Sequence, residues 1–205
     1  MFEQAFKDVL SNLTTDQLLI DKLWKEIKYK YSSSRRFYHT LTHLDNLVEE
    51  LLPVKNQIED WQTVILSVAY HDIIYNPLKK DNEERSAALA YDRLTQLGLP
   101  ENQKEKCRQQ IVSTKMHEAN DNSDTNYFTD ADLSILGSDP NSYFKYAGQI
   151  RKEYRYFPDV LYKPGRKKVL MEFLKMKSIF KTKYFRDRYE EQAKINISDE
   201  LKSLS

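Results

Sequence analysis

Cysteine and glycine are scarce in this 205-residue chain, and each scarcity excludes a class of structure. The single cysteine, Cys107, excludes a disulfide within one molecule and by itself indicates no compartment. Four glycines and six prolines are too few for the many tight turns of a typical all-β protein. The composition therefore favours a helical fold.

Long apolar runs are also missing. The longest, from Val64 to Tyr70, is interrupted by Ser67 and is much shorter than the about 20 apolar residues that a transmembrane helix needs. Residues 1–8 show neither the basic segment nor the apolar segment of a secretory signal. We therefore expect a cytoplasmic protein with no membrane partner.

Charge of one sign does not dominate the chain. Charged residues make up 31% of the sequence, but they nearly cancel to a net charge of +1. Residues 163–188 hold ten basic residues, and a basic run at helical spacing is usually a solvent-exposed helix face. The small net charge argues against nucleic acid as the main partner.

Apolar side chains recur at helical spacing through most of the chain, which predicts an all-α protein. The length suits one domain with a substantial core. The predicted helices cover residues 15–30, 41–52, 61–75, 81–97, 101–116, 128–136, 141–156, 166–179 and 184–204. Residues 61–75 are apolar nearly all round, which is typical of a central buried helix. A buried strand is the alternative, but the length of the run favours a helix.

Three finer expectations concern helix ends. Asp81 and Glu84 have the spacing of a capping box. Pro158 and the Pro164-Gly165 pair predict a loop before the helix at residues 166–179. Gly98 follows the helix at residues 81–97 and is expected to end it in the left-handed conformation.

Histidine is scarce, and its distribution is uneven. Three of the four histidines lie in two short segments, residues 38–43 and His71-Asp72, and the acidic segment at residues 130–132 follows. If a helix extends back to His39, then His39 and His43 share one face. Imidazole and carboxylate together suit divalent Zn, Fe, Mn or Mg. The pattern indicates a metal site.

Each histidine taken alone has a simpler interpretation as a hydrogen-bonded structural residue. Asp72 weakens that interpretation, because it interrupts an apolar helix, where an unpaired carboxylate is costly. A divalent cation would compensate the charge, and a buried Arg or Lys is the alternative.

The order His…His-Asp…Asp over successive helices resembles the HD superfamily of metal-dependent phosphohydrolases. Tyr38-His39-x-x-x-His43 and Ala131-Asp132-Leu133-Ser134 resemble active-site segments of cyclic-nucleotide phosphodiesterases. More closely, the chain resembles a small bacterial-type group of predicted HD phosphohydrolases over roughly residues 35–180. The matching segments are residues 36–39, His43, His71-Asp72, and residues 81–87, 130–133, 150–154 and 162–166.

The resemblance implies a single-domain helical bundle of the HD type over residues 1–205. Its core would cover roughly residues 35–140, and helices in residues 141–205 would complete the pocket. The implied metal ligands are His43, His71, Asp72 and Asp132, holding one or two divalent ions among Mn, Fe, Zn, Mg and Co. Asp72 would bridge a second ion, and Asp130 is expected to cap a helix or support a ligand.

The resemblance also implies an enzyme that hydrolyses a phosphomonoester or phosphodiester of a small molecule such as a nucleotide, using metal-activated water. His39 matches the position that protonates the leaving oxygen. Glu84 is a candidate for orienting the attacking water, or a helix cap, while Glu83 is interpreted as a helix-start carboxylate favoured by the dipole. The expected substrate contacts are Lys115, His117, Arg151, Tyr154, Tyr162 and Arg166.

Two other functions stay open. One is a non-catalytic HD module that binds a metal and a nucleotide. The other, less favoured, is an HD-type di-iron oxygenase, which needs more histidines than the single His117 between His71-Asp72 and Asp132. The nucleotide-selecting segment of the phosphodiesterases has no counterpart here, so cyclic-nucleotide specificity is not implied. The substrate, the native metal and a homodimer are left open.

Overall fold

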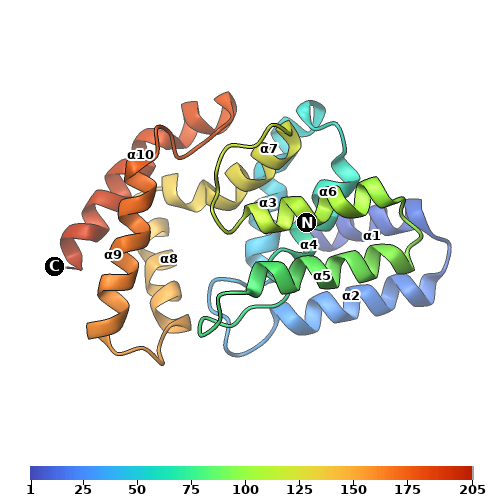
Figure 1. The fold of residues 1–205 in the computed structure, drawn as a ribbon, viewed down its shortest axis with the longest axis horizontal. Helices are drawn as coiled ribbons and strands as arrows, with labels where there is room; N and C mark the ends of the chain where they lie inside the picture. The colour runs from blue at the N-terminus through green and yellow to red at the C-terminus, as the bar shows by residue number, and fades with distance from the viewer. Residues whose placement is uncertain (205) are drawn as a thin grey trace. The chain divides into compact units, whose positions relative to one another are not determined.

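The protein is all-α, as its composition predicts. The computed structural model describes residues 1–204, which form ten α-helices and two 3-10 helices and contain no strand (Figure 1). The chain forms two compact units, Met1–Thr129 and Asp130–Ser205, which we describe separately. No helix in residues 1–204 has the length and the apolar composition that a membrane crossing requires.

The first unit is built around a buried helix, α4 (Trp61–Tyr70). Every residue from Thr63 to Tyr70 is buried, and α4 contacts α1, α3, α5 and α6. This confirms a central helix and excludes the alternative of a buried strand. The other elements of this unit are α1 (Phe2–Leu13), α2 (Gln17–Tyr31), α3 (Leu41–Leu51), η1 (Leu52–Gln57), α5 (Asn82–Gln96) and α6 (Glu101–Ser113).

Helix α4 is shorter than predicted, because it ends at Tyr70 rather than at Tyr75. The next residues turn, and side chains from other helices bind their backbone. The Asp72 N–H donates to the Tyr31 hydroxyl at 3.2 Å, and the Ile74 N–H donates to Ser86 Oγ at 3.1 Å. These acceptors replace the carbonyl groups that a longer helix would use.

Helix α3 begins at Leu41, with Thr40 as its N-cap residue. His39 therefore lies before the helix, so the condition under which His39 and His43 would share a helix face is not met. The predicted capping box at the start of α5 is wrong. Asp81 is the N-cap residue but makes no side-chain capping bond, and the Glu84 carboxylate pairs with Lys115 instead. Gly98 has φ +74°, as the end of that helix requires.

Helix α7 (Ser123–Leu133) begins in the first unit and continues into the second. The second unit also contains η2 (Ser134–Gly137), α8 (Pro140–Glu153), α9 (Asp159–Lys175) and α10 (Lys183–Ser203). Helix α10 contacts η2, α8 and α9. Gly137 lets α10 approach, because a Cβ there would lie 2.5 Å from the Tyr189 Cβ.

Helices α7 and α9 begin earlier than predicted, and α1 was not predicted. Helix α7 begins at Ser123 rather than at residue 128. Helix α9 begins at Asp159, directly after Pro158, and Pro164 lies inside it rather than in a loop. The turn before Pro164 is held by Tyr162, which is buried beside the Arg151 guanidinium. Helix α1 was not predicted, although Phe2, Phe6, Val9 and Leu10 give it a buried face at helical spacing.

Candidate metal centre

The candidate ligands come from chain segments that the fold brings together. His43 lies in the first turn of α3, and His71 caps the C-terminal end of α4, with Asp72 next to it. His39 lies in the segment before α3, and Asp132 lies at the end of α7. His43 and His71 are only 3% and 1% exposed, so their rings are nearly removed from solvent.

One nitrogen of each buried histidine points toward the other. The His43 Nε2 and His71 Nε2 atoms are 3.2 Å apart, and His71 Nε2 is also 3.2 Å from Asp72 Oδ2. His39 Nε2 lies 3.6 Å from the same Asp72 oxygen. Two imidazoles therefore lie against one carboxylate, and the third contacts His71.

Asp132 contributes a second carboxylate to the two histidines. His43, His71 and Asp132 each offer one ligand atom, and these atoms lie within 4.8 Å of one another. Two imidazole nitrogens and one carboxylate oxygen form a donor set that suits several divalent metals. The group can therefore hold a metal ion.

The hydrogen bond on the far side of the His71 ring supports that assignment. His71 Nδ1 lies 3.0 Å from the Val68 carbonyl oxygen, which only accepts, so Nδ1 carries a proton. In the neutral ring the lone pair of Nε2 then faces His43 and Asp72. Two nitrogens bound to one tetrahedral zinc ion are about 3.4 Å apart, from Zn–N bonds of about 2.0–2.1 Å. The observed 3.2 Å separation fits such an ion.

Asp72 is anionic in this environment. Burial by itself raises the pKa of the carboxyl, but the His71, His39 and His43 rings in their protonated forms together outweigh it and hold the pKa well below its usual range. The group of three ligand atoms within 4.8 Å does not include Asp72. Its ligand role therefore stays a prediction, although it lies beside His71.

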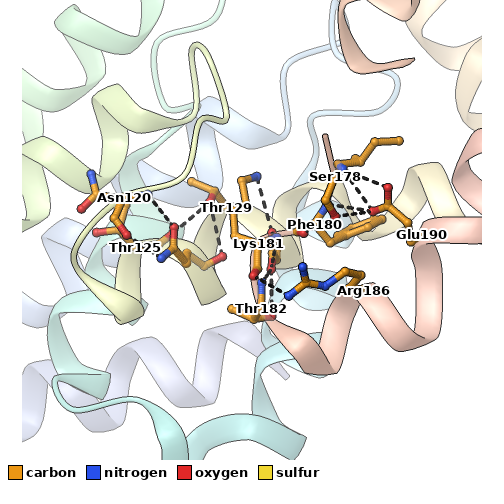
Figure 2. Close-up of polar contacts among 12 residues, drawn as sticks. Asn120, Thr125, Thr129, Ser178, Phe180, Lys181, Thr182, Arg186 and Glu190 are labelled. Atoms are coloured by element: carbon orange, nitrogen blue, oxygen red, sulfur yellow. Dashed lines mark hydrogen bonds and ion pairs between the residues drawn. The ribbon is translucent and has the colours of Figure 1, made fainter. Parts of the chain in front are cut away.

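Asp130 binds backbone groups at the start of α10. Its buried carboxylate accepts the Lys181 N–H at 2.9 Å, the Thr182 N–H at 2.7 Å and the Thr182 hydroxyl at 2.8 Å. Figure 2 labels Lys181 and Thr182 in this cluster, and Lys181 Nζ lies 3.4 Å from Asp130 Oδ1. Asp130 thus joins the end of α7 to the start of α10.

The two glutamates at the start of α5 differ in their surroundings. Glu84 is largely exposed, and its carboxylate accepts from Lys115, which also donates to the Lys80 carbonyl at 2.8 Å. Glu83 is half-buried, and burial together with the nearby Asp72 charge raises the pKa of its carboxyl. Glu83 is therefore the one whose titration depends on Asp72. The water-orienting role of Glu84 and the substrate role of Lys115 stay predictions.

His117 lies outside the helices. Helix α6 ends at Ser113 rather than at residue 116 as predicted, and a turn separates it from His117. His117 itself has φ +52°, in the left-handed region that few residues other than glycine adopt. A contact with substrate stays a prediction.

The remaining predicted substrate residues lie in the second unit and have internal partners. Arg151 pairs with Asp159 at 2.7 Å and lies 4.6 Å from the centre of the Tyr162 ring. The Tyr154 and Tyr162 rings are 5.9 Å apart. The Arg166 side chain is 8% exposed and binds Glu200 through two hydrogen bonds of 2.8 and 3.0 Å. Recognition of an anion by these residues stays a prediction.

Sequence reasoning missed three side chains that support the metal centre. Arg36, Tyr31 and Tyr75 connect the His39 segment to the turn at Asp72, through contacts described below. The resemblance included Arg36 in a matching segment but assigned it no role. Its position immediately before the Tyr38–His43 segment was the only signal.

Comparisons with known proteins leave the family open. No family model matches the chain, and no curated protein or solved structure matches it significantly.

Proposed function

We propose that the protein is a metal-dependent phosphohydrolase of the HD type that hydrolyses a phosphomonoester or phosphodiester of a small molecule. The observation that carries the proposal is the convergence of His43, His71 and Asp132, with ligand atoms within 4.8 Å of one another. Asp72 and His39 lie next to this group. A nucleotide is the first substrate class to test, because the resembled phosphohydrolases include nucleotide-cleaving enzymes.

The donor set suits the cofactor that this reaction needs. His43, His71 and Asp132 would hold a divalent ion, with Asp72 as a further ligand or as a bridge to a second ion. When bound, such an ion lowers the pKa of water from about 15.7 toward about 7 and polarises a phosphoryl oxygen. The Val68 carbonyl fixes the His71 ring so that Nε2 remains available as a ligand atom.

His39 would exchange a proton with the substrate in this proposal. Its side chain is 17% exposed, in contrast to the nearly inaccessible His71, which supports access to a ligand. Its Nε2 lies 3.6 Å from Asp72 Oδ2. A protonated His39 would donate to the leaving oxygen, where negative charge develops during phosphoryl transfer.

The proposal is tested by metal analysis of the purified protein, followed by a turnover screen. The screen uses metal-stripped protein, added Mn, Fe, Zn, Mg or Co, and a panel of phosphorylated metabolites. We expect metal-dependent release of phosphate or of a phosphomonoester, and its loss in His71→Ala and Asp72→Ala. Asp16→Ala is the control, because Asp16 only caps α2. It should lose about 0.5–2 kcal/mol of stability and keep its turnover.

Three outcomes separate the candidate functions. Unchanged turnover in both folded site variants would reject the metal centre as the catalytic site. Nucleotide-induced thermal stabilisation without product would favour a binding module, and ligand at 100 times its dissociation constant should add about 2.7 kcal/mol. Bound iron together with oxygen consumption would favour the di-iron oxygenase.

A further inference from the structure

One buried cation joins two segments that carry site residues. Arg36 is 9% exposed and lies in the connection between α2 and α3. Its Nη1 donates to the His39 carbonyl oxygen at 3.1 Å, and its Nη2 donates to the Ile73 carbonyl oxygen at 3.0 Å. A single guanidinium therefore links the residue before α3 to the turn after α4.

Two tyrosines flank this guanidinium, and each also contacts a candidate site residue. The Arg36 Cζ atom lies 4.6 Å from the centre of the Tyr31 ring and 5.5 Å from that of the Tyr75 ring. The Tyr31 hydroxyl accepts the Asp72 N–H at 3.2 Å. The Tyr75 ring lies tilted against the His39 ring, with ring centres 4.3 Å apart. Arg36 and these tyrosines thus contact the backbone of the turn at Asp72 and the ring of His39.

We propose that Arg36 is a positioning residue that sets the metal affinity of the centre. One acceptor is the carbonyl oxygen of His39, a candidate site residue. The other is the carbonyl oxygen of Ile73, which directly follows Asp72. The two bonds fix the turn after His71 relative to the segment before His43. This inference rests on the metal-binding part of the proposed function and is independent of hydrolysis.

Lysine cannot replace arginine in this role. The planar guanidinium presents donors in a rigid fork, so two nitrogens reach two acceptors at once. A lysine ammonium is a point charge on a flexible stem, and it would reach one carbonyl and leave the other unsatisfied. Arg36→Lys therefore keeps the charge and removes the link.

The chain offers a matched control in the same unit. Arg93, on α5, binds the Glu26 carboxylate through two hydrogen bonds of 2.7 and 2.6 Å. Like Arg36 it is largely buried and uses its fork to join two segments, but neither it nor Glu26 is a candidate ligand. Arg93→Lys and Arg93→Met therefore report the stability cost of losing such a fork.

The experiment measures Co²⁺ binding by competition with a chromophoric chelator and records the visible spectrum of the Co²⁺ complex, which reports ligand geometry. For Arg36→Lys and Arg36→Met we expect affinity to fall about 10–100-fold, the range typical of lost support for metal ligands, and the spectrum to change. The Arg93 variants should keep the affinity and the spectrum of the parent protein. All values are compared at equal folded fraction, determined by circular dichroism.

Parent-like affinity and spectrum in a folded Arg36→Lys protein would overturn the inference. If Arg36→Met does not fold, Tyr31→Phe provides a second measurement, because it removes only the hydroxyl that accepts the Asp72 N–H. Weaker Co²⁺ binding in Tyr31→Phe supports the inference, and unchanged binding counts against it. A parent that binds Co²⁺ and hydrolyses nothing refutes the hydrolase while leaving this inference intact. A parent that binds no divalent metal refutes both.

Discussion

His43 and His71 are separated by 28 residues, yet their Nε2 atoms lie 3.2 Å apart. Such a contact between two buried imidazoles is favourable when a proton or a metal ion lies between them. The other ring nitrogen of His71, Nδ1, already donates its proton to the Val68 carbonyl oxygen. Asp72 and Asp132 supply negative charge nearby. A divalent cation satisfies all of these groups together.

The two glutamates of α5 should differ in their effect on turnover. Glu83→Gln removes a half-buried carboxylate that interacts with Asp72, while Glu84→Gln removes an exposed one paired with Lys115. We expect Glu83→Gln to lower kcat about 10²-fold, as for a lost general acid or base, and Glu84→Gln to lower it less than about threefold. Steady-state kinetics on the substrate found by the turnover screen measures both. A larger loss in Glu84→Gln would instead favour Glu84, the residue that the sequence suggested for orienting the attacking water, and equal losses would favour neither residue.

Glu83→Gln should also stabilise the metal-free protein at neutral pH. Burial and the Asp72 charge raise the pKa of Glu83 above its ordinary value of 4.5, so the ionised form costs folding free energy. That cost is absent below the ordinary value, where both the folded and the unfolded states are protonated, and it grows as pH rises through the folded pKa. The difference in Tm between variant and parent should therefore be positive at pH 7 and vanish near pH 4. A constant difference over this range would contradict it.

Asp130 and Asp132 are two residues apart on α7 and should have separable roles. Asp130→Ala leaves the Lys181 and Thr182 donors without their acceptor and should cost about 3–5 kcal/mol of stability, as expected when a buried charged group loses its partner. Asp132→Ala should weaken metal binding and change the stability of the metal-free protein by less than about 1 kcal/mol. Urea unfolding and Co²⁺ titration distinguish them. A reversed pattern would show that the two carboxylates had been assigned the wrong way round.

Alanine substitutions at two glycines of the second unit should change the stability of the protein in opposite directions. A Cβ at Gly137 would lie 2.5 Å from both the Cβ and the carbonyl oxygen of Tyr189, so Gly137→Ala should cost at least about 1–3 kcal/mol. Gly148 lies inside α8 with nothing within 4 Å of an added Cβ, so Gly148→Ala should stabilise the helix by about 0.5–1 kcal/mol. Thermal unfolding tests both. A neutral Gly137→Ala would mean that α10 does not approach η2 this closely.

The sequence predicted most of the helices, because an apolar stripe at helical spacing depends only on local order. It failed where side chains from distant segments decide the backbone. Tyr31 and Ser86 bind N–H groups beyond Tyr70, and this end of α4 cannot be read from an apolar run. Pro164 suggested a loop, but buried Tyr162 keeps the turn helical.

The sequence predicted only part of the candidate site, because contacts from distant segments again decide the rest. The scarce histidines indicated a metal site, and the resemblance to the HD superfamily named His43, His71 and Asp132 among its ligands, which the structure brings together. Residue types did not identify the support provided by Arg36, because it acts through backbone carbonyls rather than through a recognisable pair of charges. Sequence reasoning also favoured Glu84 over Glu83 for orienting water, whereas Glu83 is the half-buried one, with a carboxyl pKa raised by burial and by the Asp72 charge.

The most direct test of the account is the stoichiometry and affinity of divalent metal binding, measured by elemental analysis and Co²⁺ titration of the parent, His43→Ala, His71→Ala and Asp132→Ala proteins. The account predicts one or two ions per chain in the parent and a large loss of affinity in each variant, with the helical circular dichroism spectrum retained. A parent protein that retains no ion after dialysis against metal, or three folded variants that bind metal as tightly as the parent, would contradict it.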